Sequence, residues 1–175
     1  MKAILKAGAI LVFTLSASLS HATPVKMSWD DLRFLIGEWE AIGQGKPDEA
    51  KGGFSFAFDL QGKIIVRRNY AEYPAMAGRP AAKHEDFMVI YADDTSDQTR
   101  ASYFDSEGHV INYKVELSAD HQVVTFLSDP LPSKPQYRLT YTKLKDGTLG
   151  GKFEIAPPGQ PEAFKNYLEW VSRKR

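Results

Sequence analysis

Short segments in which apolar and polar side chains alternate follow one another along most of this chain. Between residues 111 and 117 the odd-numbered positions are apolar and the even-numbered positions are polar, a period of two that is typical of a half-buried β-strand. Turn-forming residues separate these segments, as in Asp105-Ser106-Glu107-Gly108. The pattern predicts about ten strands, at residues 37–43, 54–58, 63–73, 84–91, 100–104, 110–117, 123–127, 137–143, 149–155 and 164–173.

The strand pattern is not interrupted by any long segment with helical periodicity. Consecutive antiparallel strands form either a sandwich or a closed up-and-down barrel, and closure removes the exposed edges that invite aggregation. Residues 164–173 could be helical by residue type, but a barrel needs a strand there to pair with the first one. We therefore predict an all-β fold, a single antiparallel up-and-down β-barrel of about ten strands.

A short helix is expected just before the first strand, at residues 28–35. Ser28 is suited to the N-cap position, and Asp30 and Asp31 suit the positive end of the helix dipole. Gly37 is expected to end this helix, because glycine commonly follows the last helical turn.

The N-terminus has the three parts of a secretory signal. Lys2 and Lys6 precede or flank an uncharged run, residues 8–19, and small residues follow up to Ala22. The run is shorter than the roughly 20 residues that a membrane span needs, although an uncleaved anchor is the alternative. We expect a signal peptide at residues 1–22, cleaved near Ala22, a barrel domain at residues 23–175 without a membrane span, and a bacterial periplasmic or secreted location.

Charge and cysteine content narrow the class of protein further. The chain has 22 basic and 22 acidic residues, so removal of Lys2 and Lys6 leaves 20 against 22, a net charge of −2. This balance gives no electrostatic reason to expect nucleic acid or an anionic membrane as a partner. The chain has no cysteine, so its core alone must hold the fold, which suits a periplasmic protein better than a secreted disulfide scaffold.

A first candidate binding site lies on the long strand at residues 63–73. Arg68 and Tyr70 are two residues apart and share one face of the strand, so inside a barrel they would bind a carboxylate together. Both arginines of this strand could also lie on the surface. The opposite register would instead turn inward the side chains of Ile65, Arg67, Asn69 and Tyr73.

A second candidate is a cluster at one rim of the barrel. A hairpin turn at residues 93–97 would bring His84 and Asp86 level with Asp105, and His109 starts the next strand. Two imidazoles with carboxylates are suitable ligands for a divalent metal or an acid/base pair. The alternative is ordinary turn chemistry with solvated histidines.

Aromatic side chains are a third set of candidates. Tyr103, Tyr113 and Tyr141 could line a pocket for a flat or long apolar ligand, although such residues more often pack the core.

Four stretches of the chain, FLIGEWE, HEDFMVIY, YFDSEGHVINY and YRLTYT, support a family resemblance. A short helix followed by Gly37 and Trp39 resembles the opening of lipocalin and related calycin barrels. More specifically, the chain resembles bacterial exported calycin-like proteins of unknown function, which are similar in architecture to fatty-acid-binding proteins and nitrobindin-like barrels. The resemblance implies that Trp39 plugs the closed end and that Arg173, with Arg175 in reserve, packs over its ring.

The same resemblance bears on cofactors and function. Nitrobindin-like proteins hold haem iron by a late histidine, and no histidine follows His121 here, which argues against haem; no other cofactor is expected. The leading hypothesis is a binding protein for a small hydrophobic or amphipathic ligand, including one with a carboxylate. The alternatives are an enzyme that uses the rim cluster and a ligand-free structural or stress-related envelope protein.

Overall fold

Ten antiparallel strands close into one up-and-down barrel in the computed structural model, which describes residues 27–42 and 50–175. The predicted signal peptide, residues 1–22, lies outside the described residues. The elements are η1 (Trp29–Leu35), β1 (Gly37–Ala41), β2 (Lys51–Asp59), η2 (Leu60–Gly62), β3 (Ile64–Tyr73), β4 (Ala82–Asp93), β5 (Gln98–Asp105), β6 (Val110–Leu117), β7 (Val123–Ser128), β8 (Gln136–Lys143), β9 (Leu149–Ala156) and β10 (Lys165–Lys174).

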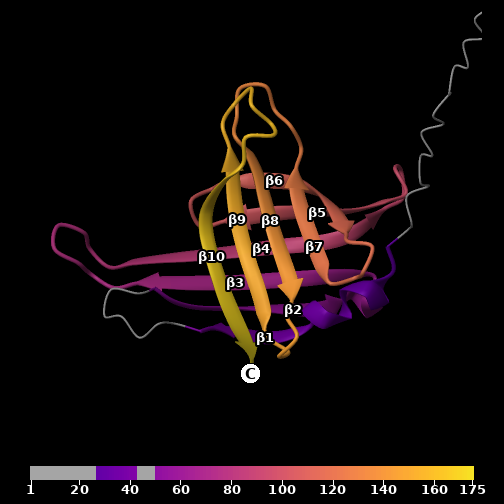
Figure 1. Cartoon of the computed structure of the whole chain (residues 1–175), viewed down its shortest axis with the longest axis horizontal. Helices are drawn as coiled ribbons and strands as arrows, with labels where there is room; N and C mark the ends of the chain where they lie inside the picture. The colour runs from indigo at the N-terminus through magenta and orange to yellow at the C-terminus, as the bar shows by residue number, and fades with distance from the viewer. Residues whose placement is uncertain (1–26, 43–49) are drawn as a thin grey trace, which may run out of the picture.

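Each strand pairs with its neighbours in the sequence, and β1 pairs with β10 to close the barrel. The prediction of a barrel is confirmed, including the assignment of the last segment as a strand. In Figure 1, β2 to β5 run across the view, β8 to β10 cross in front of them, and η1 lies at one end. No helix within residues 27–42 and 50–175 is long and apolar enough to cross a membrane.

The interior of the barrel is packed with side chains, many of them aromatic. Tyr141 contacts Phe54, Phe56 and Phe126, with ring centroids 5.4, 5.4 and 6.3 Å away. All four rings are buried, and two of the three pairs are edge-to-face, a preferred aromatic geometry. The middle of the barrel is therefore a packed core.

The helix η1 covers one end, which we call the closed end. Two of its own residues, Leu32 and Leu35, are fully buried, and the Trp39 indole donates its Nε1–H to the Leu35 carbonyl oxygen at 2.8 Å. The helix is a 3₁₀ helix that ends at Leu35 with Ile36 as its C-cap, so Gly37 begins β1 rather than ending the helix.

The cation that lies over Trp39 is Lys174, not the predicted Arg173. Lys174 Nζ is 5.6 Å from the centroid of the Trp39 ring system, and Arg173 instead ion-pairs with Glu40 at 3.5 Å. The reason is register: Trp39 is opposite Lys174, so Arg173 faces the other side of the sheet.

Gly37 makes room for this lysine. Its φ is +132°, which favours glycine, and a Cβ atom there would lie 2.4 Å from Lys174 Cε. The Gly-x-Trp sequence thus works as a unit, in which the glycine lets the cation reach the ring.

We expect Trp39→Ala to lower the free energy of unfolding by about 3–5 kcal/mol, because it removes a large buried ring and leaves a cavity. Urea unfolding followed by circular dichroism measures this loss.

Tyr167→Ala is the matched control. Its ring is 65% exposed, so its removal should change stability by no more than about 0.5 kcal/mol. Equal effects of the two substitutions would contradict the role of Trp39 at the closed end.

Candidate functional site

The register of β3 decides which of two neighbouring arginines lies inside the barrel. Arg67 is 4% exposed and faces inward with Ile65, whereas Arg68 is exposed and stacks over the ring of Phe87 at 4.9 Å. The structure therefore has the opposite register from the one that would place Arg68 and Tyr70 in the cavity. The neighbouring positions 64–66 are all apolar, so alternation in the sequence does not distinguish the two faces.

Arg67 is the centre of a buried polar network. Its Nη1 forms an ion pair with Asp86 Oδ1, and the two side chains are 5% and 4% exposed. Its Nε donates to the Tyr141 hydroxyl at 2.9 Å, and Asn69 Nδ2 donates to Asp86 Oδ2 at 2.8 Å. The guanidinium also lies 5.6 Å from the ring centroid of Phe54.

The surroundings of this network keep Arg67 charged and the nearby tyrosines neutral. Burial lowers the pKa of Arg67, but Tyr141 and Asp86 outweigh this effect, so the pKa is raised and the charge is retained. Burial raises the pKa of Tyr103 and of Tyr113, so both phenols stay protonated. A buried ion pair contributes little net stability, because desolvation offsets the attraction. Titratable groups with perturbed pKa values that lie close together are typical of functional sites.

The network continues to the rim of the open end, opposite η1. His84 Nε2 is 3.3 Å from Asp86 Oδ2, and the Tyr103 hydroxyl lies 3.4 Å from both His84 Nε2 and Asp105 Oδ2. Asp105 Oδ2 is 2.9 Å from His109 Nδ1. The structure thus brings together the rim residues that the hairpin pattern predicts: His84, Asp86, Asp105 and His109.

Glu107 is a member of this cluster that the sequence analysis missed. Its Oε2 is 2.8 Å from His84 Nδ1, and it lies in the turn between β5 and β6. Burial lowers the pKa of His84, but the hydrogen bond and charge of Glu107, followed by Asp86, raise it overall. Burial raises the pKa of Asp105, and hydrogen bonds from His109 lower it overall. The signal in the sequence was the acidic residue two positions after Asp105.

Aromatic rings form the wall of the open end contributed by β8 to β10. Tyr137 stacks on Phe153 with centroids 5.9 Å apart, and Tyr167 meets Phe153 edge-on at 6.1 Å. Trp170 packs on Tyr141 at 6.1 Å and against Gly151, where a Cβ would lie 2.1 Å from the indole. Of the predicted tyrosines, Tyr113 and Tyr141 are fully buried below these rings, and Tyr103 is half-buried at the rim.

The predicted Arg68–Tyr70 pair lies on the outside of the barrel. Both residues line a groove of about 640 Å³ on the outer face of β1 to β5, together with Phe87, Phe104 and Arg175.

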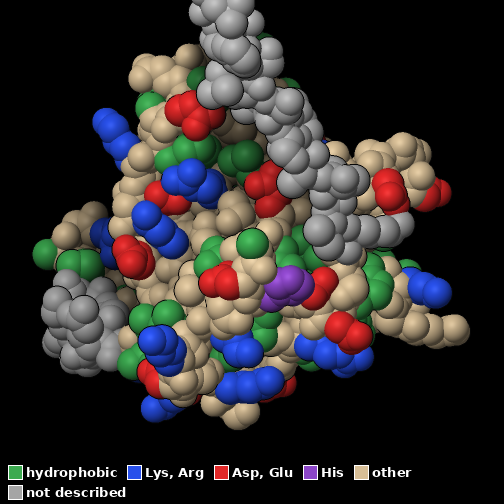
Figure 2. Space-filling model, turned by 45° about the vertical axis from the view of Figure 1, so that its right-hand side comes forward, with side chains coloured by type: hydrophobic (Ala, Val, Ile, Leu, Met, Phe, Trp, Pro, Cys, Tyr) green, Lys and Arg blue, Asp and Glu red, His purple; other side chains and the backbone are tan. Residues whose placement is uncertain are grey.

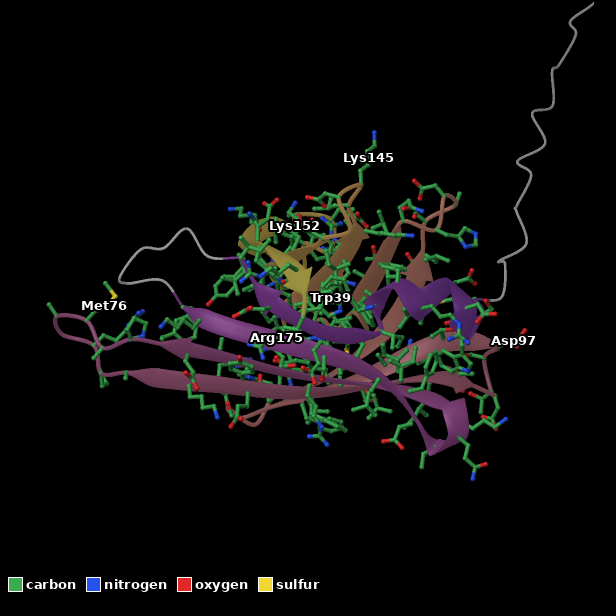
Figure 3. The ribbon with its side chains drawn as sticks, turned by 90° about the horizontal axis from the view of Figure 1, so that it is seen from below. Trp39, Met76, Asp97, Lys145, Lys152 and Arg175 are labelled. Atoms are coloured by element: carbon green, nitrogen blue, oxygen red, sulfur yellow. The ribbon has the colours of Figure 1, made fainter. Side chains whose placement is uncertain are left out.

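Figure 3 shows Arg175 close to Trp39, near the middle of the molecule, and Met76 and Asp97 at its opposite ends. Figure 2 shows acidic and basic side chains interspersed over much of the face that it presents.

We expect Arg67→Met to lower the free energy of unfolding by about 3–5 kcal/mol, because it leaves the Asp86 carboxylate buried without its partner. Urea unfolding followed by circular dichroism measures the change.

The control is Arg33→Met, which removes an ion pair to Asp30 whose side chains are 66% and 77% exposed, and it should cost no more than about 1 kcal/mol. The double substitution Arg67→Met/Asp86→Leu should be more stable than Arg67→Met alone. A single variant as stable as the wild type would show that the pair is not buried.

We expect NMR titration to show that the pKa of His84 lies above the ordinary value of about 6.5 and falls in Glu107→Gln. Because the folded-state pKa is raised, the interaction stabilises the fold fully below about pH 6.5 and is lost as the pH rises through the folded pKa. Glu116→Gln, an exposed carboxylate on β6, should leave the titration of His84 unchanged. A His84 pKa at or below the ordinary value would contradict the Glu107 contact.

The comparisons with known proteins assign no family. Neither the family models nor the curated proteins give a match to this chain. The calycin-like resemblance thus stays a prediction, and the function has to be argued from the geometry of the open end.

Proposed function

We propose that this protein is an exported binding protein whose barrel holds a small amphipathic molecule at its open end. The observation that carries the proposal is the division of this end into two chemical halves. One half is the polar network around Arg67 and His84, and the other is the aromatic wall around Phe153. Ligand sites typically combine an apolar lining with a few placed polar groups.

The polar half favours a neutral or cationic head group over a carboxylate. Arg67 is already paired with Asp86, and His84 and His109 are paired with the carboxylates of Glu107 and Asp105, so none of these groups is left to balance a ligand carboxylate. Asp105 and Glu107 add two further carboxylates near the rim. A ligand carboxylate would find no unpaired cation among these groups, whereas an amine, alcohol or amide would find carboxylate acceptors.

The aromatic half suits an apolar tail. Tyr167 is 65% exposed, and the rings of Tyr137 and Phe153 are only partly buried, so apolar surface is left in contact with water. Covering such surface is favourable by about 25 cal/mol per Å². Cationic heads gain in addition from the faces of nearby rings.

Two rival functions fit these observations less well. A ligand-free structural barrel gains no net stability from a buried ion pair, which an apolar pair of similar size could replace. An enzyme that uses the rim cluster needs a bound substrate first, so a binding site is the simpler proposal. The export that we propose is supported by the signal-like residues 1–22.

We expect decylamine and decanol to bind the purified protein, and decanoate to bind at least about tenfold more weakly, at pH 7.5 in isothermal titration calorimetry. Phe153→Ala should weaken decylamine binding about tenfold, because it removes a ring from the proposed tail site. Native mass spectrometry of protein from its own source tests for a co-purified molecule of the same class.

Phe104→Ala is the matched control, since Phe104 is a 43% exposed ring in the outer groove. It should leave binding unchanged. Loss of binding in Phe104→Ala with full binding in Phe153→Ala would move the site to the outer groove and overturn the proposal.

A further inference from the structure

We propose that the rim of the open end is a binding site for a divalent transition-metal ion of the zinc class. Its ligands are Asp105, Glu107 and His109 from the β5–β6 turn and His84 from β4. This proposal stands on the rim residues alone and does not depend on the amphipathic ligand proposed above.

The ligand atoms already lie close to one another. One atom each from Asp105, Glu107 and His109 falls within 4.8 Å of the other two. The fourth ligand, His84, has its Nδ1 2.8 and 3.0 Å from the two carboxylate oxygens of Glu107. Bonds of about 2.0–2.2 Å to one ion need ligand atoms within roughly 4 Å of each other, so the three ligands of the turn need only small side-chain rotations, and His84 reaches the group through its contact with Glu107.

The types of ligand select the metal. Two imidazoles and two carboxylates match zinc and its neighbours among the transition metals, which accept nitrogen as readily as oxygen. Calcium and magnesium prefer sets made of oxygen alone. The two histidines therefore distinguish this cluster from the acidic turns that are common on protein surfaces.

The residues behind the ligands hold them in place. His84 turns its other ring nitrogen, Nε2, toward Asp86 Oδ2 at 3.3 Å, and Asp86 is 4% exposed and paired with Arg67. A carboxylate behind a histidine is the arrangement that orients metal-bound imidazoles. Asp105 is 6% exposed and accepts the backbone N–H of His109 at 2.8 Å, so its carboxylate is fixed as well.

The test is titration of the full chain, purified without a histidine tag, with zinc chloride in a calorimeter at pH 7.5. We expect one ion per chain. His109→Gln and Glu107→Gln should each weaken binding at least about tenfold, and His84→Ala/His109→Ala should abolish stoichiometric binding. His109 is 65% exposed, so its replacement should leave the protein folded, which circular dichroism measures.

The matched control is His121→Gln. His121 is also an exposed histidine beside a carboxylate, with its Nδ1 2.8 Å from Asp31 Oδ1, but it lies at the closed end. Its replacement should not change zinc binding. The proposal is overturned if the folded protein takes up no stoichiometric zinc, if His84→Ala/His109→Ala still binds it, or if calcium binds as tightly as zinc.

Discussion

The ion pair between Arg67 and Asp86 is the interaction on which the open end of this barrel depends. Each charge would be costly to bury alone, and each satisfies the other within a network that includes Asn69 and Tyr141. Asp86 extends the network to His84, and through Tyr103 it reaches Asp105. The orientation of the rim residues therefore follows from a pair of charges held deep in the barrel.

The two ends of the barrel differ in the residues that cover them. At the closed end, η1 buries Leu32 and Leu35, and Trp39 is held between the Leu35 carbonyl and the Lys174 side chain. Apolar burial and the cation–π contact of Lys174 with Trp39 complete that end. At the open end no helix among the described residues covers the rings of β8 to β10, and His84 and Tyr103 are only partly buried. The closed end thus contributes apolar packing to the fold, and the open end carries the polar rim residues.

The strand count and the barrel could be predicted from the sequence, because alternation and turn residues are local features. Register could not, since it depends on which face of a strand meets the core. Positions 64–66 are all apolar, so the choice between Arg67 and Arg68 became clear only from the inward partners of β4. For the same reason the sequence could not show that Lys174, and not Arg173, lies over Trp39. The register between β1 and β10 determines which of the two faces the ring. The rim cluster was predictable because a single hairpin turn brings its members level. Glu107 was not predicted, because it lies in the turn between β5 and β6, where the alternation of a strand does not indicate which way a side chain points.

The two proposed ligands would share one rim, and their charges would be coupled. A divalent cation on Asp105 and Glu107 would cancel the excess negative charge that favours an amine head group over a carboxylate. Metal binding should then lower the affinity for cationic ligands. By linkage, a bound cationic ligand should lower the affinity for the metal by the same factor. The buried Arg67–Asp86 pair would stay in place in both states, because its partners lie below the rim and do not depend on the ion.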